Sequence, residues 1–106
     1  MTYAKKSLGQ NYLIDLNIIR KIVNSVEVYN KNILEIGPGR GALTEEIIKK
    51  KPKSLILIEK DDKLASELRL KYKNNKKIII YNKDILKFNF EEKVKSKSII
   101  FGNLPY

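Results

Sequence analysis

The chain has 106 residues, enough for one small domain, and carries 22 Lys and Arg against 12 Asp and Glu, a net charge of +10. It contains no Cys and no His, which excludes a disulfide framework, a thiolate metal site and chemistry that needs an imidazole base. A hydrophobic fraction of 42% and a mean hydropathy of −0.37 indicate a globular chain. The charge favours a polyanionic partner such as nucleic acid, although a composition bias toward lysine would produce the same charge.

The first residues, Met1–Lys6, carry charge without a following apolar segment, so no secretory signal is expected. No apolar run approaches the roughly 20 residues needed to cross a bilayer. We therefore expect a cytoplasmic protein without a membrane partner. We also expect no metal site, since carboxylates are the only common metal ligands that the composition leaves.

The predicted elements alternate between helix and strand along the chain. After a basic, irregular lead, Asp15 is a good helix N-cap, and apolar residues with helical spacing predict a helix to about Glu27. A loop or short helix is expected at 85–96, with Phe88 and Phe90 packing inward. The alternation is typical of βαβ units, so the expected fold class is α/β with a parallel sheet and flanking helices. Short apolar runs predict the strands at 32–36, 54–58, 78–80 and 99–101.

Two further helices are expected between the first three strands. The first follows a glycine-rich turn and ends at Lys49–Lys51 before Pro52. We interpret these lysines as a solvated helix end rather than an RNA contact, because cations complement the carboxyl end of a helix. The second helix begins at Asp61 or Asp62, either of which can cap it, and is broken by the asparagine pair at 74–75.

The stretch Asn32–Thr44 reads as a buried strand, a glycine-rich turn and the start of a helix. Gly37, Gly39 and Gly41 allow a tight turn and a close approach of a ligand to the backbone. The helix N-terminus behind them offers unpaired N–H groups, so the pattern predicts a nucleotide-type site. The glycine spacing fits a dinucleotide site as well as an S-adenosylmethionine site. Glu59, 20 residues after Gly39, can bond ribose hydroxyls in either case, so NAD and S-adenosylmethionine both remain open.

Two later features favour S-adenosylmethionine. Asp84 ends the third strand, where its carboxylate can accept from an adenine amine; the alternative is a turn aspartate that caps the following segment. After the fourth strand, the Asn103 side-chain oxygen and the Leu104 carbonyl can accept the two N–H bonds of a target amine. Such bonds favour a tetrahedral nitrogen with its lone pair aimed at the methyl group. Pro105 restricts Leu104 to an extended conformation, and Tyr106 offers a ring on which an extruded base stacks.

Together these residues resemble the rRNA adenine N6-dimethyltransferase family. Lys6–Leu13 resembles its N-terminal motif, usually with Phe where Tyr12 stands, and Glu35–Thr44 resembles its cofactor loop. The resemblance covers essentially the whole chain and implies a Rossmann-like S-adenosylmethionine-dependent methyltransferase fold. Gly-Pro-Gly, Ala-Leu-Thr and Leu104 look like the KsgA-type branch, which dimethylates two adjacent adenines near the 3′ end of small-subunit (16S) rRNA in ribosome biogenesis. The alternative is the Erm-type branch, which modifies a large-subunit adenine.

The resemblance also implies which residues form the site. It assigns cofactor binding to Gln10, Asn11, Leu13, Gly37, Gly39, Glu59, Lys60, Asp84, Ile85 and Asn103. It assigns catalysis to Asn103, Leu104, Pro105 and Tyr106. It assigns RNA contacts to Lys5, Lys6 and Tyr106. The expected cofactor is S-adenosyl-L-methionine, and the expected partner is small-subunit rRNA or the pre-30S particle.

The family's catalytic domain continues past the Asn-Leu-Pro-Tyr motif, and a small helical domain then helps to grip RNA. We therefore expect 1–106 to be the N-terminal part of a methyltransferase catalytic domain, with strand order 3-2-1-4. Its apolar fourth strand would be an uncovered edge through which the fragment could self-associate. Such a fragment is expected to bind cofactor weakly and not to methylate RNA alone. Two other functions stay open: part of an NAD-dependent oxidoreductase, which leaves Asn103–Tyr106 unexplained, and an RNA-binding role in ribosome assembly without turnover.

Overall fold

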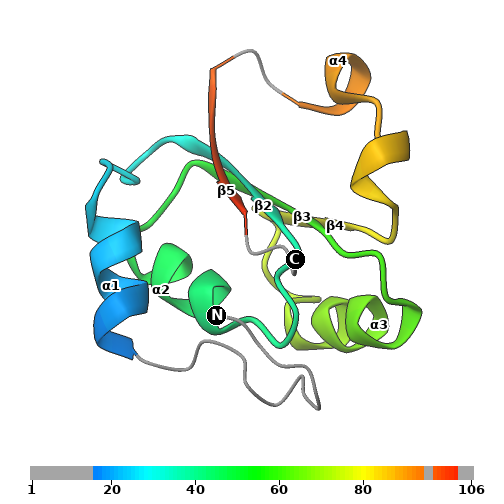
Figure 1. Ribbon diagram of the computed structural model, residues 1–106, viewed down its shortest axis with the longest axis horizontal. Coiled ribbons are helices and arrows are strands. Elements are labelled where there is room, and N and C mark those ends of the chain that lie inside the picture. The colour runs from blue at the N-terminus through cyan, green and yellow to red at the C-terminus, as the bar shows by residue number, and fades with distance from the viewer. Residues whose placement is uncertain (1–15, 95–96, 103–106) are drawn as a thin grey trace.

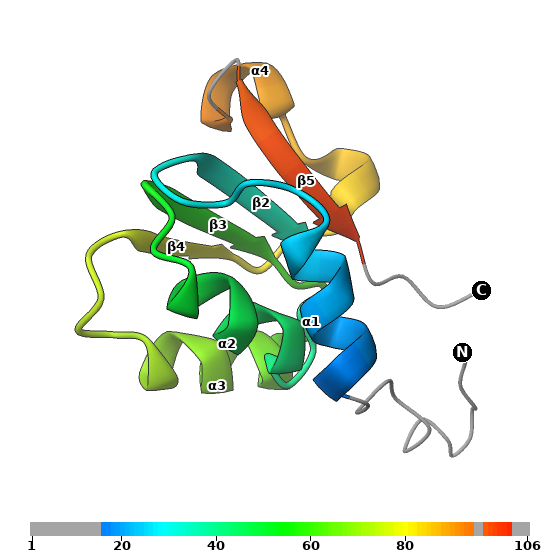
Figure 2. The ribbon, with the colours of Figure 1, turned by 90° about the vertical axis from the view of Figure 1, so that its left-hand side faces the viewer.

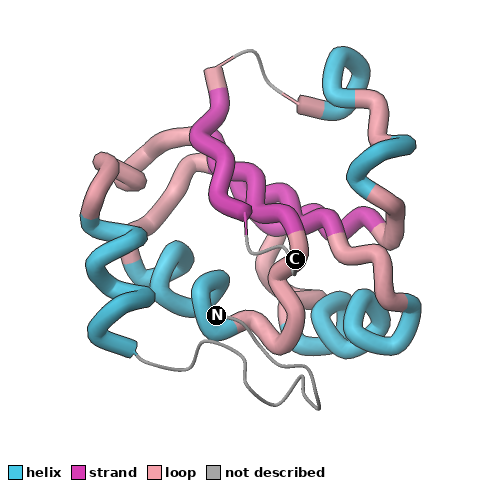
Figure 3. Tube along the Cα trace, in the orientation of Figure 1, coloured by secondary structure: helices cyan, strands magenta, loops and turns pink. Residues whose placement is uncertain are grey.

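The computed structural model describes residues 16–94 and 97–102. Within these ranges, one parallel sheet has the strand order β4-β3-β2-β5 (labelled in Figure 1; magenta in Figure 3). This confirms the predicted parallel pairing and the predicted order 3-2-1-4. The strands are β2 (Asn32–Ile36), β3 (Ser54–Ile58), β4 (Ile78–Tyr81) and β5 (Ser98–Gly102).

Helices cover the two faces of the sheet unequally. One face is covered by α1 (Leu16–Asn24), α2 (Ala42–Lys49) and α3 (Asp62–Lys71). The other face carries only the short 3-10 turn η1 (Ile85–Lys87) and the single-turn helix α4 (Phe90–Lys93) in the described part of the chain (Figures 1 and 2). None of the helices found in the described ranges has the length and apolar character needed to cross a membrane.

The sheet separates two clusters of buried apolar side chains. Successive residues of a strand point to opposite faces, so β2 and β3 contribute to both clusters and need continuous apolar runs. The larger cluster, toward α1, α2 and α3, contains Ile19, Val23, Val28, Ile33, Leu43, Ile47, Leu55, Leu57, Leu68 and Phe101. The smaller cluster, toward η1, contains Leu34, Ile56, Ile58 and Phe88.

Helix α1 ends at Asn24, three residues before the predicted end at Glu27. The backbone N–H and the hydroxyl of Ser25 both donate to the Ile22 carbonyl, at 3.3 and 2.6 Å. These bonds close the last turn and compete with continuation of the helix. Val28 then enters the larger core cluster from the connection to β2.

The prediction that both phenylalanines of the 85–96 segment pack inward is right for Phe88 and wrong for Phe90. Phe88 is 9% exposed, whereas Phe90 is 38% exposed. The Asn89 side chain accepts from the Glu92 N–H at 3.1 Å and starts α4 at Phe90. The rings of Phe90 and Phe88 are T-shaped to one another, with centroids 5.2 Å apart.

Candidate cofactor site at the carboxyl edge of the sheet

The carboxyl ends of the strands meet at one edge of the sheet. Ile36 of β2 pairs with Ile58 of β3 and with Gly102 of β5, and Ile58 pairs with Tyr81 of β4. The chain runs outward from β2 to β4 through α2 and α3, and then returns across the other face to β5 (Figure 1). The strand order thus reverses between β2 and β5, which is where open α/β sheets bind their ligands.

The glycine turn leads directly from β2 into α2 at this edge. Gly37, Gly39 and Gly41 have φ values of 71°, 59° and 92°, the left-handed region that favours glycine. The Gly37 N–H donates to the Ile58 carbonyl at 2.9 Å, and the Gly41 N–H donates to the Pro38 carbonyl at 2.9 Å. The predicted tight turn is therefore present, and it is bonded to the end of β3.

The turn has an open side at Gly39 and a packed side at Gly41. A Cβ atom added to Gly39 would meet no atom within 4 Å, whereas one added to Gly41 would lie 3.4 Å from the Tyr72 hydroxyl. Gly41 is also the N-cap of α2 and supplies no side-chain hydrogen bond to the first turn of the helix. Helix N–H groups without a capping side chain attract anionic or polar ligand groups.

Glu59 follows β3 and lies against the glycine turn. Its Oε1 accepts from the Gly39 N–H at 3.0 Å, and its Oε2 accepts from the Asp61 N–H at 3.0 Å. The Asn82 side chain donates to the Glu59 carbonyl at 3.0 Å. Glu59 is only 7% exposed, so its carboxylate is held in one position. A carboxylate has about four acceptor positions, which leaves two for the hydroxyl groups of a ligand.

Asp84 lies one strand further out, after β4. Its Oδ1 accepts from the Leu86 N–H at 3.0 Å and caps η1, which is the alternative interpretation considered for this residue. Its Oδ2 is 4.0 Å from the Lys60 ammonium. Ile85 packs against the smaller core cluster. Oδ1 of Asp84 thus caps η1, and Oδ2 faces the Lys60 ammonium.

Glu35 is a buried carboxyl beneath the turn that the sequence reading assigned no role. It is fully buried in β2, and its Oε1 accepts from the Thr44 hydroxyl of α2 at 2.5 Å. Its Oε2 has no hydrogen-bond partner in the described part of the chain. Burial raises the pKa of Glu35 to about 7; the Thr44 bond opposes this shift and the charge of Glu59 adds to it. The sequence does contain a sign of this buried carboxyl, because an acidic residue stands inside the apolar run Ile33–Ile36.

A second polar contact fixes α2 to α3 behind Gly41. The Tyr72 hydroxyl donates to Glu45, and the Lys71 ammonium lies 3.3 Å from the Glu45 Oε2. The bond from Tyr72 holds the pKa of Glu45 below its ordinary value, and burial raises the pKa of Tyr72. This contact places the Tyr72 ring behind the turn, where it supports the packed side at Gly41.

The structure brings Gly37, Gly39, Glu59, Lys60, Asp84 and Ile85 to one edge of the sheet. Their roles toward a cofactor stay predictions. Among residues 16–94 and 97–102, no group of three or more acidic side chains lies together as a metal site would require. The expected helix cap Asp15 lies outside the described residues. So do the other predicted site residues, which are Lys5, Lys6, Gln10, Asn11, Leu13, Asn103, Leu104, Pro105 and Tyr106.

Comparison with known proteins identifies the family. The family model described as ribosomal RNA adenine dimethylase matches residues 1–106, the whole chain. The chain belongs to this family. It is 53% identical over 103 residues to ribosomal RNA small subunit methyltransferase A of Pelagibacter ubique, covering 97% of this chain and 38% of that protein. It is 47% identical over 104 residues to the protein of the same name from Mycoplasmopsis pulmonis, covering 97% of this chain and 39% of that protein. The chain thus spans less than two fifths of these relatives.

Solved structures of similar fold agree with this family. The 23S rRNA methyltransferase ErmE superposes with a TM-score of 0.75 at 30% identity, over 91% of this chain and 38% of that chain. A dimethyladenosine transferase from Plasmodium falciparum gives a TM-score of 0.67 at 28% identity, over 85% of this chain and 32% of that chain. The described sheet is therefore the N-terminal part of the S-adenosylmethionine-dependent methyltransferase fold, which confirms the predicted fold class.

Proposed function

We propose that residues 1–106 are the N-terminal, cofactor-binding part of the catalytic domain of an RNA adenine N6-methyltransferase that uses S-adenosylmethionine. The observation that carries the proposal is the bond from the Gly39 N–H to the Glu59 carboxylate, 3.0 Å long. It joins the glycine turn to the acidic end of the neighbouring strand at the reversal point of the sheet. A glycine turn bonded to a carboxylate in this way is suited to bind a ribose and the group attached to that ribose.

The described residues fit this cofactor. The open side of Gly39 lets a ligand lie against the backbone, and the two unused acceptor positions of Glu59 suit vicinal ribose hydroxyls. Asp84, with Lys60 and Ile85 beside it, would receive the adenine ring and its amine. When bound, S-adenosylmethionine supplies an electrophilic methyl group, and these residues hold and orient the molecule that carries it.

The proposed substrate is a pair of adjacent adenines near the 3′ end of small-subunit (16S) rRNA, modified during ribosome biogenesis. The relative from Pelagibacter ubique, 53% identical to this chain, is named ribosomal RNA small subunit methyltransferase A. The 23S rRNA methyltransferase ErmE is 30% identical. The proposed partner is accordingly small-subunit rRNA or the pre-30S particle, and the proposed location is the cytoplasm, where that RNA is assembled. Self-association through β5 is a further proposal for the chain by itself.

The roles at the target amine rest on the sequence. Asn103 and the Leu104 carbonyl would accept the two N–H bonds of the adenine amine, so that the nitrogen lone pair is free to attack. Pro105 would fix the direction of that carbonyl, and Tyr106 would stack on the extruded base. Lys5 and Lys6 would contact RNA phosphates. Gln10, Asn11 and Leu13 would surround the methionine end of the cofactor.

Calorimetric titration of the chain with S-adenosylhomocysteine and with NAD tests the cofactor assignment. We expect weak but measurable binding of S-adenosylhomocysteine and none of NAD. Glu59→Gln should weaken that binding by about tenfold or more, because a charge-assisted hydrogen bond is lost. Glu67→Gln, on the exposed face of α3, is the matched control and should bind as the wild type does. Tighter binding of NAD than of S-adenosylhomocysteine would refute the assignment.

An RNA-binding role without turnover is separated from catalysis by Asn103→Ala in a version of the protein that extends to the length of its relatives. We expect loss of methyl transfer from labelled S-adenosylmethionine to 16S rRNA, with RNA affinity retained. Full methyl transfer by the variant would remove Asn103 from the proposed site.

A further inference from the structure

The amino-terminal edge of the sheet, opposite the glycine turn, carries a row of four lysines. Each described strand begins directly after one of them: Lys31 before β2, Lys53 before β3, Lys77 before β4 and Lys97 before β5. Because the strands are parallel, these residues share one edge, with neighbouring strands about 4.8 Å apart. The Lys53 N–H donates to the Lys31 carbonyl at 2.8 Å, and the Leu55 N–H donates to the Lys77 carbonyl at 2.9 Å. We call the four residues the lysine edge.

No ion pair of the lysine edge is found among the residues that the structure describes. All four side chains are exposed, and none pairs with a carboxylate in the described ranges. Like charges at this spacing repel one another, so the row is electrostatically suited to an external polyanion. Lysines elsewhere do pair with carboxylates: Lys49 with Glu46, Lys60 with Asp84, Lys71 with Glu45 and Lys93 with Glu92.

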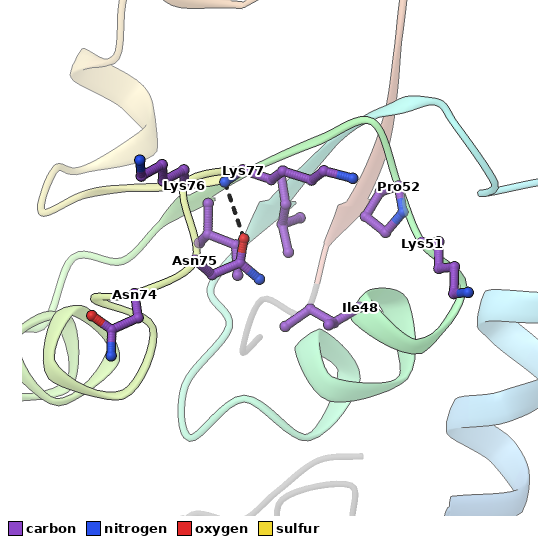
Figure 4. A pocket seen from close by; sticks show the side chains of 9 residues that line it. Ile48, Lys51, Pro52, Asn74, Asn75, Lys76 and Lys77 are labelled. Carbon is purple, nitrogen blue, oxygen red and sulfur yellow. Dashed lines mark hydrogen bonds between the residues drawn. The ribbon is translucent and has the colours of Figure 1, made fainter.

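A cavity of about 520 Å³ opens beside the lysine edge (Figure 4). Ile48 and Pro52 supply apolar surface and Asn75 supplies an amide, while Lys51 and Lys76 line the rim with their ammonium groups turned outward (Figure 4). The Asn75 Oδ1 accepts from the backbone N–H of Lys77 at 3.0 Å, and no bond from the Asn75 amide NH₂ is found among the described residues. The sequence interpretation placed Lys51 in a solvated helix end, but it also lines this cavity. Apolar, amide and cationic groups together match a base and its phosphate.

Tyr29 adds an exposed aromatic ring near the same edge. It is 64% exposed, while Val28 before it is buried in the larger core cluster and anchors the segment. The Asn30 N–H donates to the carbonyl of Lys51 at 2.9 Å, which places this turn next to a residue that lines the cavity. A basic surface combined with an accessible ring is the arrangement on which proteins stack single-stranded bases.

We propose that the lysine edge, the cavity and Tyr29 bind a second segment of RNA, apart from the segment that carries the target adenine. The identity of the polyanion as RNA rests on the proposed function. The five-residue strands separate the two edges of the sheet by about 16 Å, so one nucleotide cannot occupy both sites. The aromatic ring and the amide beside the phosphate-binding cations favour RNA over an acidic peptide or a lipid headgroup, neither of which presents bases.

Two triple variants with the same loss of charge test this proposal. The first removes three of the four charges of the lysine edge with Lys31→Gln, Lys53→Gln and Lys77→Gln and leaves Lys97. The second neutralises exposed lysines away from it with Lys21→Gln, Lys63→Gln and Lys87→Gln. The readout is fluorescence anisotropy of a labelled single-stranded RNA oligonucleotide, measured without cofactor over a series of salt concentrations.

We expect the first variant to bind RNA at least about tenfold more weakly, with a salt dependence shallower by about 2 to 3 units, because three phosphate contacts are lost. The second variant should lose much less. Tyr29→Ala should weaken binding by about tenfold through the loss of stacking, and Tyr29→Phe should restore it. All variants should keep the wild-type affinity for S-adenosylhomocysteine.

Equal losses in the two triple variants, or an unchanged salt slope in the first, would overturn the proposal. So would binding to phosphatidylglycerol vesicles or to polyglutamate that depends on the lysine edge while RNA binding does not. The test is independent of the cofactor assignment, because RNA affinity is measured without cofactor. Failure to bind S-adenosylhomocysteine would count against the proposed function and leave the result on the lysine edge standing.

Discussion

Two glycines of the turn share a left-handed backbone but differ in their surroundings, which gives their substitution different consequences. Gly39→Ala would place a methyl group at φ 59°, which costs about 1 kcal/mol, in open space where the ligand is proposed to lie. We expect modest destabilisation and near-complete loss of S-adenosylhomocysteine binding. Urea unfolding and calorimetry measure the two effects.

Gly41→Ala and Gly102→Ala are the controls for this prediction. At Gly41 the added Cβ would lie 3.4 Å from the Tyr72 hydroxyl at φ 92°, so stability should fall at least as far as in Gly39→Ala. A Cβ atom added to Gly102 would meet no atom within 4 Å, and Gly102 has no positive φ. The stability of Gly102→Ala should therefore equal that of the wild type. Wild-type cofactor affinity in Gly39→Ala would refute the proposed approach of the ligand to that backbone.

Glu35 predicts an unusual dependence of stability on pH. Its pKa is about 7 in the folded chain and 4.5 in a solvated carboxyl. As pH rises from 4.5 to 7, the unfolded chain therefore releases this proton before the folded chain does. The free energy of unfolding should fall by up to about 3 kcal/mol over this interval because of Glu35 and be unaffected by it at lower pH.

Glu35→Gln keeps an acceptor for Thr44 and removes the titration. We expect the variant to gain stability relative to the wild type as pH rises from 5 to 8, measured by urea unfolding at each pH. Glu45→Gln is the control of opposite sign: the pKa of Glu45 is lowered, so its stabilising contribution should be present near neutral pH and lost in acid. A constant difference between wild type and Glu35→Gln across pH would contradict the assigned pKa.

At the scale of elements, the start of α3 connects helix stability to the site. The Asp61 side chain accepts from the Leu64 N–H at 2.9 Å, while the Asp61 N–H donates to Glu59. Asp61→Ala should therefore cost about 1 kcal/mol of stability through loss of the cap. The neighbouring carboxylate Asp62 lies in the first turn, where its charge supports the helix through the dipole. Asp62→Ala should cost less in urea unfolding, and the reverse order would contradict the assignment of the cap.

At the scale of the whole molecule, one face of the sheet remains partly uncovered in the described chain. Leu34 pairs with Ile56 and Ile100, and Ile56 pairs with Ile79, so all four share this face. The outer two, on edge strands of the described sheet, are exposed, Ile79 by 50% and Ile100 by 54%. An exposed apolar edge favours association with another chain.

Ile100→Lys should therefore reduce self-association of the 106-residue chain, measured by sedimentation velocity at increasing concentration. Leu86→Lys is the matched control, because Leu86 is 89% exposed but lies on η1, which follows β4 at the opposite side of the sheet from β5. It should associate as the wild type does. A wild type that stays monomeric at high concentration would refute the prediction.

The sequence by itself determined the order and type of the elements, because apolar periodicity and the turn chemistry of glycine and proline are local properties. Strand β2 at 32–36 and strand β3 at 54–58 were placed to the residue. Gly37, Glu59 and Asp84 could be assigned to one edge, since parallel strands bring their carboxyl ends together. The joint occurrence of these motifs along the chain also identified the family.

Only the tertiary structure decided the features that depend on contacts between distant segments. The exposure of Phe90 follows from the position of α4 relative to the sheet, and the raised pKa of Glu35 follows from burial between β2 and α2. The lysine edge is likewise invisible as a pattern, because its members are about 20 residues apart along the chain and are joined only by strand pairing. Burial, ligand access and the summing of charge are properties of the assembled sheet.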